Sequence, residues 1–182
     1  GDFGRRRDPA MAWRRTRNFI AHRHGDFSFD PYYTFDWYMD TCERNGLQAA
    51  FYFIADHSAG EIDGTYEIEE PRVLDLIRKM AKRGHEIGMH GSYKTFQDPA
   101  QISQERARLQ RAAGKAGLSA PIAGNRQHYL RWDTGQTPDH LDAAGFAYDT
   151  TGGFADLPGF RHGTSHDFAM WNWRTLAPLK LR

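Results

Sequence analysis

The fold is decided by the stretch Gly84-His85-Glu86-Ile87-Gly88-Met89-His90-Gly91-Ser92-Tyr93. Its apolar residues predict a short strand that runs into a loop, with His90 at the strand end. An amphipathic segment from Pro71 to Arg83, closed by Gly84, predicts a helix immediately before this strand. Proteins with parallel α/β sheets place their chemistry at the carboxyl ends of strands, so His90 is the first candidate site residue.

The same unit of a helix, a glycine stop and a short apolar strand recurs along the chain. We predict helices over 35–45, 71–83, 98–117 and 137–145, followed by strands over 48–55, 84–90, 122–125 and 146–149. Thr34, Asp98 and Thr137 are the expected N-caps. This alternation predicts parallel βα units in one domain of 182 residues, arranged as an open sheet or a barrel.

Four polar side chains follow the predicted strands. They are Asp56, His90, His128 and Asp149. Because the carboxyl ends of parallel strands share one edge of the sheet, we expect the architecture to gather these residues.

The composition is that of a globular protein, with 40% hydrophobic and 26% charged residues and a net charge of +1. Nothing in it demands a nucleic-acid or membrane partner, and no apolar run approaches the ~18 residues that span a bilayer. Cys42 is the only cysteine, so an internal disulfide is excluded. In the helix predicted around it, Cys42 is expected to be a buried structural thiol.

The N-terminal part is basic, with seven Arg and two Asp among residues 1–24. A helix is predicted from Pro9 to His22. Four of its side chains are available for burial: Met11, Trp13, Phe19 and Ile20. A basic helix can bind nucleic acid, but a solvated surface helix is the preferred interpretation.

His85 and His90 are five residues apart. Side chains alternate along a strand, so this odd offset places them on opposite faces, and the two cannot bind one ion. We expect His85, next to the glycine stop, to be a structural histidine bonded to the backbone. His90 is the site candidate.

The motif Gly-His-Glu-Ile-Gly-x-His at residues 84–90 resembles the second motif of the polysaccharide deacetylases, the NodB-homology superfamily of carbohydrate esterases. The resemblance extends from about residue 28 to residue 165. It implies a distorted (β/α) barrel, here incomplete at both ends, and metal-dependent hydrolysis of a C–N bond, the N-deacetylation of an amino sugar. The variant motif is similar to that of deacetylase-like proteins of bacterial surface-polysaccharide synthesis.

The resemblance also implies a metal centre, with one departure from the family pattern. The family carries a second histidine four residues after the first, whereas Lys94 stands there, and an ammonium group is no metal ligand. The segment Arg126-Gln127-His128-Tyr129 falls where the family has its third motif. We therefore expect His90 and His128 to bind a divalent metal, zinc by preference.

The family's first motif contains an aspartate pair, and Thr34-Phe35-Asp36 resembles it. The predicted helix from Phe35 fills the interval before the next strand, so Asp36 is interpreted as a first-turn acid that favours the helix dipole. The aspartate motif is then expected upstream of Gly1. The chain would be a fragment that is inactive by itself.

Other roles follow from position within the resemblance. His162 or His166 is the expected general acid, Asp149 is expected to position catalytic groups, and Tyr129 to bond the oxyanion. Four more residues are expected to bind the carbohydrate: Tyr93, Lys94, Arg126 and Arg161.

Two other functions on the same fold stay open. One is a metal-free or non-catalytic sugar-binding relative, and the other is amide hydrolysis or transfer on a sugar acid. No secretion signal opens the chain, which favours a cytoplasmic location.

Overall fold

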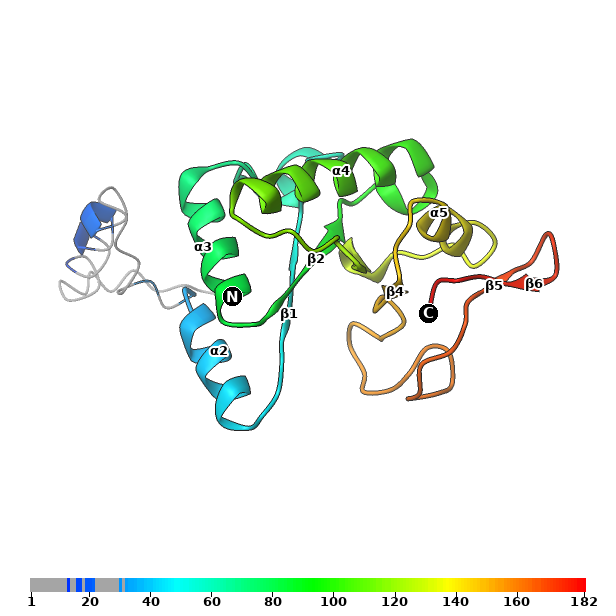
Figure 1. Cartoon of the computed structure of the whole chain (residues 1–182). Coiled ribbons are helices and arrows are strands. Elements are labelled where there is room, and N and C mark those ends of the chain that lie inside the picture. The colour runs from blue at the N-terminus through cyan, green and yellow to red at the C-terminus, as the bar shows by residue number, and fades with distance from the viewer. Residues whose placement is uncertain (1–12, 14–15, 18, 22–29, 31) are drawn as a thin grey trace, which may run out of the picture. The chain divides into compact units, whose positions relative to one another are not determined.

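A computed structural model describes residues 13, 16, 17, 19–21, 30 and 32–182 (Figure 1). The chain divides into two compact units, Gly1–Leu47 and Gln48–Arg182. The other residues of the predicted 9–22 helix lie outside this description, including Met11.

The first unit contains helix α2, Phe35–Arg44, with Asp36 in its first turn and Cys42 half-buried. Thr34 precedes the helix, but its side chain makes no capping hydrogen bond, so the predicted hydroxyl cap is wrong. The described part of the predicted N-terminal helix is helical.

Three of the apolar side chains that were available for burial in the N-terminal helix are exposed. Trp13, Phe19 and Ile20 are 69%, 62% and 53% exposed. Their exposure agrees with the preferred interpretation of this segment as a surface helix.

The second unit is built on a parallel four-stranded sheet with the order β1-β2-β3-β4. The strands are β1 Ala50–Phe53, β2 Glu86–Gly91, β3 Gly124–Gln127 and β4 Tyr148–Asp149. Helices separate them along the chain, so the predicted parallel βα architecture is confirmed. Four strands make an open segment of the kind that an incomplete, distorted barrel contains.

The connections hold three helices and three 3₁₀ turns: η1 Gly60–Asp63, α3 Pro71–Lys82, η2 Thr95–Gln97, α4 Pro99–Lys115, η3 His128–Leu130 and α5 Thr137–Ala143. Helices α3 and α4 pack against β2 and against each other (Figure 1). After β4 the chain forms a long irregular loop and an antiparallel hairpin, β5 Trp171–Asn172 with β6 Ala177–Pro178.

Side chains that are almost completely buried fill the layer between sheet and helices: Ile77, Met80, Ile87, Met89, Ile102, Leu109, Ile122 and Leu141. Ile87 and Met89 point to this layer, and the intervening Gly88 and His90 therefore face the other side of the sheet. None of the described helices is long and apolar enough to cross a membrane.

The two predicted N-caps of this unit behave differently. The Asp98 carboxylate accepts hydrogen bonds from the N–H groups of Ala100 and Gln101, both at 3.0 Å, as predicted. Thr137 lies inside α5 and Gln136 is the cap residue. The Thr137 hydroxyl accepts a bond from Asp133 N–H and donates to the Phe96 carbonyl, so it ties the loop to η2 and leaves the helix start uncapped.

Two glycines let tyrosine rings lie across the sheet face that carries His90. A Cβ atom on Gly88 would be 2.6 Å from the Tyr52 ring, and one on Gly124 would be 2.3 Å from the Tyr148 hydroxyl oxygen. The Tyr148 hydroxyl donates to Glu86 at 2.6 Å. Any larger residue at either glycine would displace a ring that packs directly on backbone.

Candidate active site

Two histidines meet at the carboxyl ends of β2 and β3. His90 pairs with Arg126 in the sheet register, and His128 begins η3 two residues later. Their ring centres are 5.1 Å apart, with the planes tilted by 59°. This spacing is compatible with two imidazoles that share one ion, because zinc–nitrogen bonds are ~2.0–2.1 Å long.

The environment of the His90 imidazole disfavours its charged form. Burial lowers its pKa to about 4, and the positive charges of His128 and Arg126 act in the same direction. Its Nδ1 atom is buried and has no hydrogen-bond partner among the described residues. A neutral imidazole with a buried, unpartnered ring nitrogen is a group that could bind a divalent metal.

Asp63 lies directly behind His128 and is completely buried. Its Oδ1 accepts from His128 Nδ1 at 2.9 Å and from Tyr93 N–H at 2.7 Å. Its Oδ2 accepts from Ala59 N–H at 2.7 Å and from the Ser58 hydroxyl at 3.4 Å. One carboxylate therefore joins the loops that follow β1, β2 and β3.

These contacts keep Asp63 ionised. Burial raises its pKa, but the bonds from His128, Ala59 and Tyr93 outweigh burial, and the net pKa is lowered. A carboxylate on Nδ1 places the proton of a neutral His128 there and leaves Nε2 as a free electron pair. This is the carboxylate–histidine arrangement that orients metal ligands in proteins.

Two tyrosines form one wall beside the histidines. The Tyr129 ring is 4.7 Å from His128 and 5.6 Å from the Tyr93 ring, centre to centre. Tyr129 is 64% exposed, so its ring is available to a ligand. An exposed aromatic face next to a polar site suits the stacking of a sugar ring.

The backbone beside His128 is strained. Tyr129 and Leu130 have φ values of 57° and 53°, in the left-handed region that non-glycine residues rarely adopt. Arg161 donates to the Leu130 carbonyl at 3.0 Å. Arg131 lies between the rings of Tyr93 and Phe96 at 4.1 and 4.2 Å and donates to the Tyr93 carbonyl at 2.7 Å.

The predicted sugar-binding cations lie in different places. Lys94 is exposed next to Tyr93, and its backbone N–H donates to Ser58. Arg126 lies in β3 opposite His90 and donates to the Thr150 carbonyl. The bond of Arg161 to Leu130 makes it a support of the site's backbone.

The sheet does not gather all four predicted strand-end residues. The Asp56 carboxylate accepts from Gln101 at 3.2 Å and Arg108 at 3.3 Å, both on α4. The Asp149 carboxylate accepts from Asn125 Nδ2 at 2.6 Å and from the Thr151 N–H and hydroxyl. Both acids are engaged by other partners, so the gathering holds for the two histidines.

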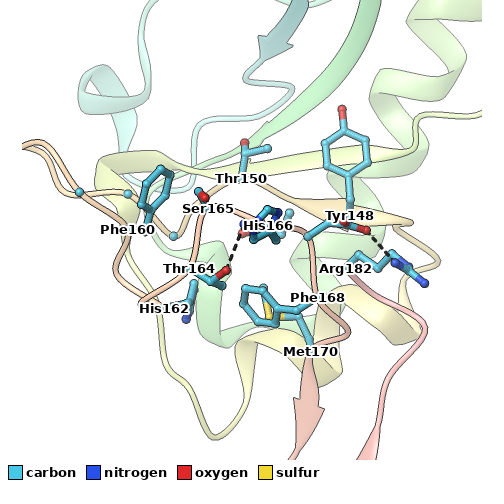
Figure 2. A pocket seen from close by; sticks show the side chains of 15 residues that line it. Tyr148, Thr150, Phe160, His162, Thr164, Ser165, His166, Phe168, Met170 and Arg182 are labelled. Atoms are coloured by element: carbon cyan, nitrogen blue, oxygen red, sulfur yellow. Dashed lines mark hydrogen bonds and ion pairs between the residues drawn. The ribbon is translucent and has the colours of Figure 1, made fainter.

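A separate cavity of about 490 Å³ lies beside β4 and holds the remaining candidates. Asp149, His162 and His166 line it, and Figure 2 shows His162 and His166 around it with Phe168 and Met170. Burial raises the pKa of Asp149 to about 6. His162 lies 6.1 Å from the Trp132 ring, and burial lowers its pKa, with Arg161 acting in the same direction.

No group of three or more His, Cys, Asp or Glu side chains in the described part of the chain is arranged to hold a metal. The pair His90 and His128 could supply two imidazole nitrogens to a metal ion, with ring centres 5.1 Å apart. A third protein ligand would have to come from elsewhere.

His85 is the structural histidine that was predicted. It is buried, and its Nδ1 accepts from Ala49 N–H at 3.2 Å. Two residues of the site were not predicted: Asp63 and Arg131. Asp63 stands in an acidic loop with no periodicity, and its sequence context offers no signal that would single it out.

A family model described as polysaccharide deacetylase matches residues 27–150. Among solved structures, the chain is similar to the Xyl-CE4 domain of a multidomain xylanase from the hindgut metagenome of Trinervitermes trinervoides, with 16% sequence identity and a TM-score of 0.44. That match covers 62% of this chain and 50% of the other, so the chain spans half the length of that structure. Curated proteins gave no match.

Proposed function

The chain belongs to the polysaccharide deacetylase family, and on this premise we propose that it removes N-acetyl groups from an amino sugar, in a polysaccharide or its precursor, with zinc as the cofactor. The observation that carries the proposal is the imidazole pair of His90 and His128, whose ring centres are 5.1 Å apart at adjacent strand ends. Asp63 supports it by orienting His128.

His90 and His128 would hold the ion through unprotonated nitrogens. Zinc, when bound at such a site, lowers the pKa of a bound water to ~7 and polarises the carbonyl oxygen of the amide. The third ligand and the carboxylate base are expected from the family's aspartate motif. We do not assign Asp63 as the third ligand or as the base, because both of its carboxylate oxygens already accept hydrogen bonds.

The surrounding residues would bind and orient the substrate. The exposed Tyr129 ring and the adjacent Tyr93 would stack against the sugar, and Tyr129 would donate a hydrogen bond to the oxyanion. Lys94 and Arg126 would contact the sugar's oxygens. His162 or His166 would protonate the leaving amine, and Asp149 would position these groups from the cavity wall.

Acetate release from an N-acetylated oligosaccharide, with and without added zinc, tests the proposal. We expect zinc-dependent release, and a loss of at least about 100-fold in His90→Gln and His128→Gln. His140→Gln on α5 is the matched control and should retain activity. Tight zinc binding without acetate release from any N-acetylated glycan would overturn the deacetylase assignment.

A metal-free sugar-binding relative is the second candidate. It is favoured by Lys94 in place of the second family histidine and by the lack of a three-ligand cluster within the described residues. Zinc content separates the two functions, since a binding relative would hold the glycan without zinc. Amide chemistry on a sugar acid is less well supported, because Arg161, its proposed carboxylate partner, bonds to Leu130.

A further inference from the structure

Three apolar side chains, Phe160, Phe168 and Met170, line the cavity of about 490 Å³ beside β4 (Figure 2). The His162 ring lies next to them, with its centre 5.4 Å from that of the Phe168 ring. Pockets of ~300–1,000 Å³ with mainly apolar walls bind small molecules in proteins. An acetyl group would fill only a small part of this space, so the cavity has room for a larger group of a substrate.

Hydroxyl groups stand among these apolar side chains. Thr150, Thr164 and Ser165 line the same cavity, and the Thr164 hydroxyl accepts from the His166 N–H at 3.1 Å. Hydroxyls can donate as well as accept hydrogen bonds. Aromatic faces beside hydroxyl groups match a sugar, which has apolar C–H faces and a rim of hydroxyls. The lining therefore favours a carbohydrate.

The charges in the lining favour a carbohydrate without a net charge. Arg182 is the only Lys or Arg among the residues that line the cavity, and its guanidinium donates to Asp167 at 2.7 Å. Asp149 is the other acid in the lining, and its two oxygens already accept hydrogen bonds. Burial lowers the pKa of His162, which disfavours a positive charge on that ring. An anionic sugar would meet two carboxylates and a guanidinium that is already paired.

Two arginines connect the cavity to the loops that carry the histidine pair. Arg126 pairs with His90 in the sheet register and donates to the carbonyl of Thr150, a residue of the cavity lining. Arg161 comes from the loop that encloses the cavity and donates to the Leu130 carbonyl in η3 at 3.0 Å. The cavity is thus joined to the same edge of the sheet as the candidate metal site.

We propose that this cavity is a subsite for an uncharged hexose residue, the neighbour of the N-acetylated residue in the glycan. The neighbour relation rests on the proposed function, whereas the preference for an uncharged residue rests on the cavity lining. The subsite narrows the substrate class to glycans in which a neutral sugar stands next to the amino sugar. A sugar acid at that position is excluded.

Calorimetric titration of the whole chain, after removal of metal with a chelator, measures binding without catalysis. The probes are N-acetylglucosamine, lacto-N-biose and the hyaluronan disaccharide. The two disaccharides join N-acetylglucosamine through the same linkage to galactose or to glucuronate, so they differ in the charge of the neighbour. We expect lacto-N-biose to bind about 3- to 10-fold more tightly than N-acetylglucosamine, and the hyaluronan disaccharide to show no gain. No gain for lacto-N-biose, or an equal gain for both disaccharides, would overturn the proposal.

The methyl group of Met170 reports whether the neutral residue enters the cavity. Its side chain lines the cavity and is 6% exposed, and its ¹³C-methyl signal can be assigned from its loss in Met170→Leu. Lacto-N-biose should shift this signal and leave that of Met80, which is buried between sheet and helices, unchanged. Tighter binding without a shift at Met170 would place the second residue elsewhere and contradict the subsite.

Two variants should remove the gain in affinity for lacto-N-biose. Phe168→Ala deletes an aromatic face, and Gly152→Ala places a Cβ atom 2.4 Å from the His162 ring, which must then move. Leu157→Ala is the control, because Leu157 is exposed in the same loop and lies outside the cavity lining. A gain retained in both variants, or lost equally in Leu157→Ala, would contradict the proposal.

The subsite and the proposed function can fail separately. Absence of acetate release from any N-acetylated glycan, with the preference for lacto-N-biose intact, would remove only the deacetylase assignment. Acetate release by a chain that binds lacto-N-biose no better than N-acetylglucosamine would remove only the subsite.

Discussion

The histidine pair at the ends of β2 and β3 and the histidines of the cavity beside β4 are held in different ways. His128 is bonded to a buried carboxylate that also collects three other donors. His162 and His166 stand on a long loop, and the side chain of His166 is exposed. A site that is fixed in advance by buried hydrogen bonds can hold a metal, whereas a loop with exposed side chains is better suited to contact a substrate.

The largest difference between the regions should appear on removing a carboxylate from each. Asp63→Ala would leave buried donors from three loops unsatisfied, and we expect the free energy of unfolding to fall by about 3–5 kcal/mol. Asp167→Ala on the cavity side loses an exposed ion pair with Arg182 and should cost at most about 0.5 kcal/mol. Urea unfolding of both variants measures these changes in the free energy of unfolding. Equal decreases in the two variants would show that the two regions are not held in different ways.

His90 should make one pH-dependent contribution to stability, and Asp149, whose pKa burial raises to about 6, should make one of the opposite sign. The folded pKa of His90 is about 4, below the ordinary 6.5. Between pH 4 and pH 6.5, His90 therefore binds a proton in the unfolded chain but not in the folded chain. The His90 contribution to the free energy of unfolding therefore falls as the pH drops from 6.5 to 4, by up to about 3 kcal/mol.

His90→Gln should flatten this slope by close to one proton, measured by urea unfolding at several pH values. A variant as steep as the wild type across the same window would show that His90 is not the group responsible. Above pH 6.5 the His90 contribution is complete and constant.

The two arginines that support the strained backbone provide a smaller comparison. The Arg131 side chain packs between two rings and bonds to Tyr93, whereas the Arg161 side chain is exposed and its guanidinium bonds to Leu130. We expect Arg131→Ala to lower the free energy of unfolding by about 1–2 kcal/mol and Arg161→Ala by about half that. A larger effect of Arg161→Ala would mean that the 152–170 loop is the stronger support.

The smallest effect is expected at Lys94. If His128 already provides the second imidazole, Lys94→His, which restores the family's histidine spacing, should change zinc affinity by less than about tenfold. Zinc titration of this variant measures it. A much larger gain would indicate that His128 does not act as a ligand.

The elements that could be predicted from the sequence are those with local signals. Prolines at helix starts and glycines at helix ends predicted the βα units. The order of these units predicted that His90 and His128 lie at neighbouring strand ends. Their separation could be anticipated because parallel strands share an edge, so two consecutive units bring their ends together.

Long-range polar partners could not be predicted in this way. Packing brings Asp63 to Tyr93, which is 30 residues away in the sequence. It brings Glu105 to Ser92, which is 13 residues away. Asp56 and Asp149 follow strands as expected, yet cations and amides from other elements engage them. Thr137 failed as a cap because it lies inside α5, where its hydroxyl oxygen accepts from the Asp133 N–H instead of from the first helical turn.

We propose that His90 and His128 bind one zinc ion together, and zinc titration of the wild-type chain beside His90→Gln and His128→Gln is the decisive experiment. We expect one zinc per chain in the wild type, with an affinity that falls at least about 10-fold in each variant and remains unchanged in His140→Gln. Zinc binding that is equally strong in the wild type and in both variants would contradict it.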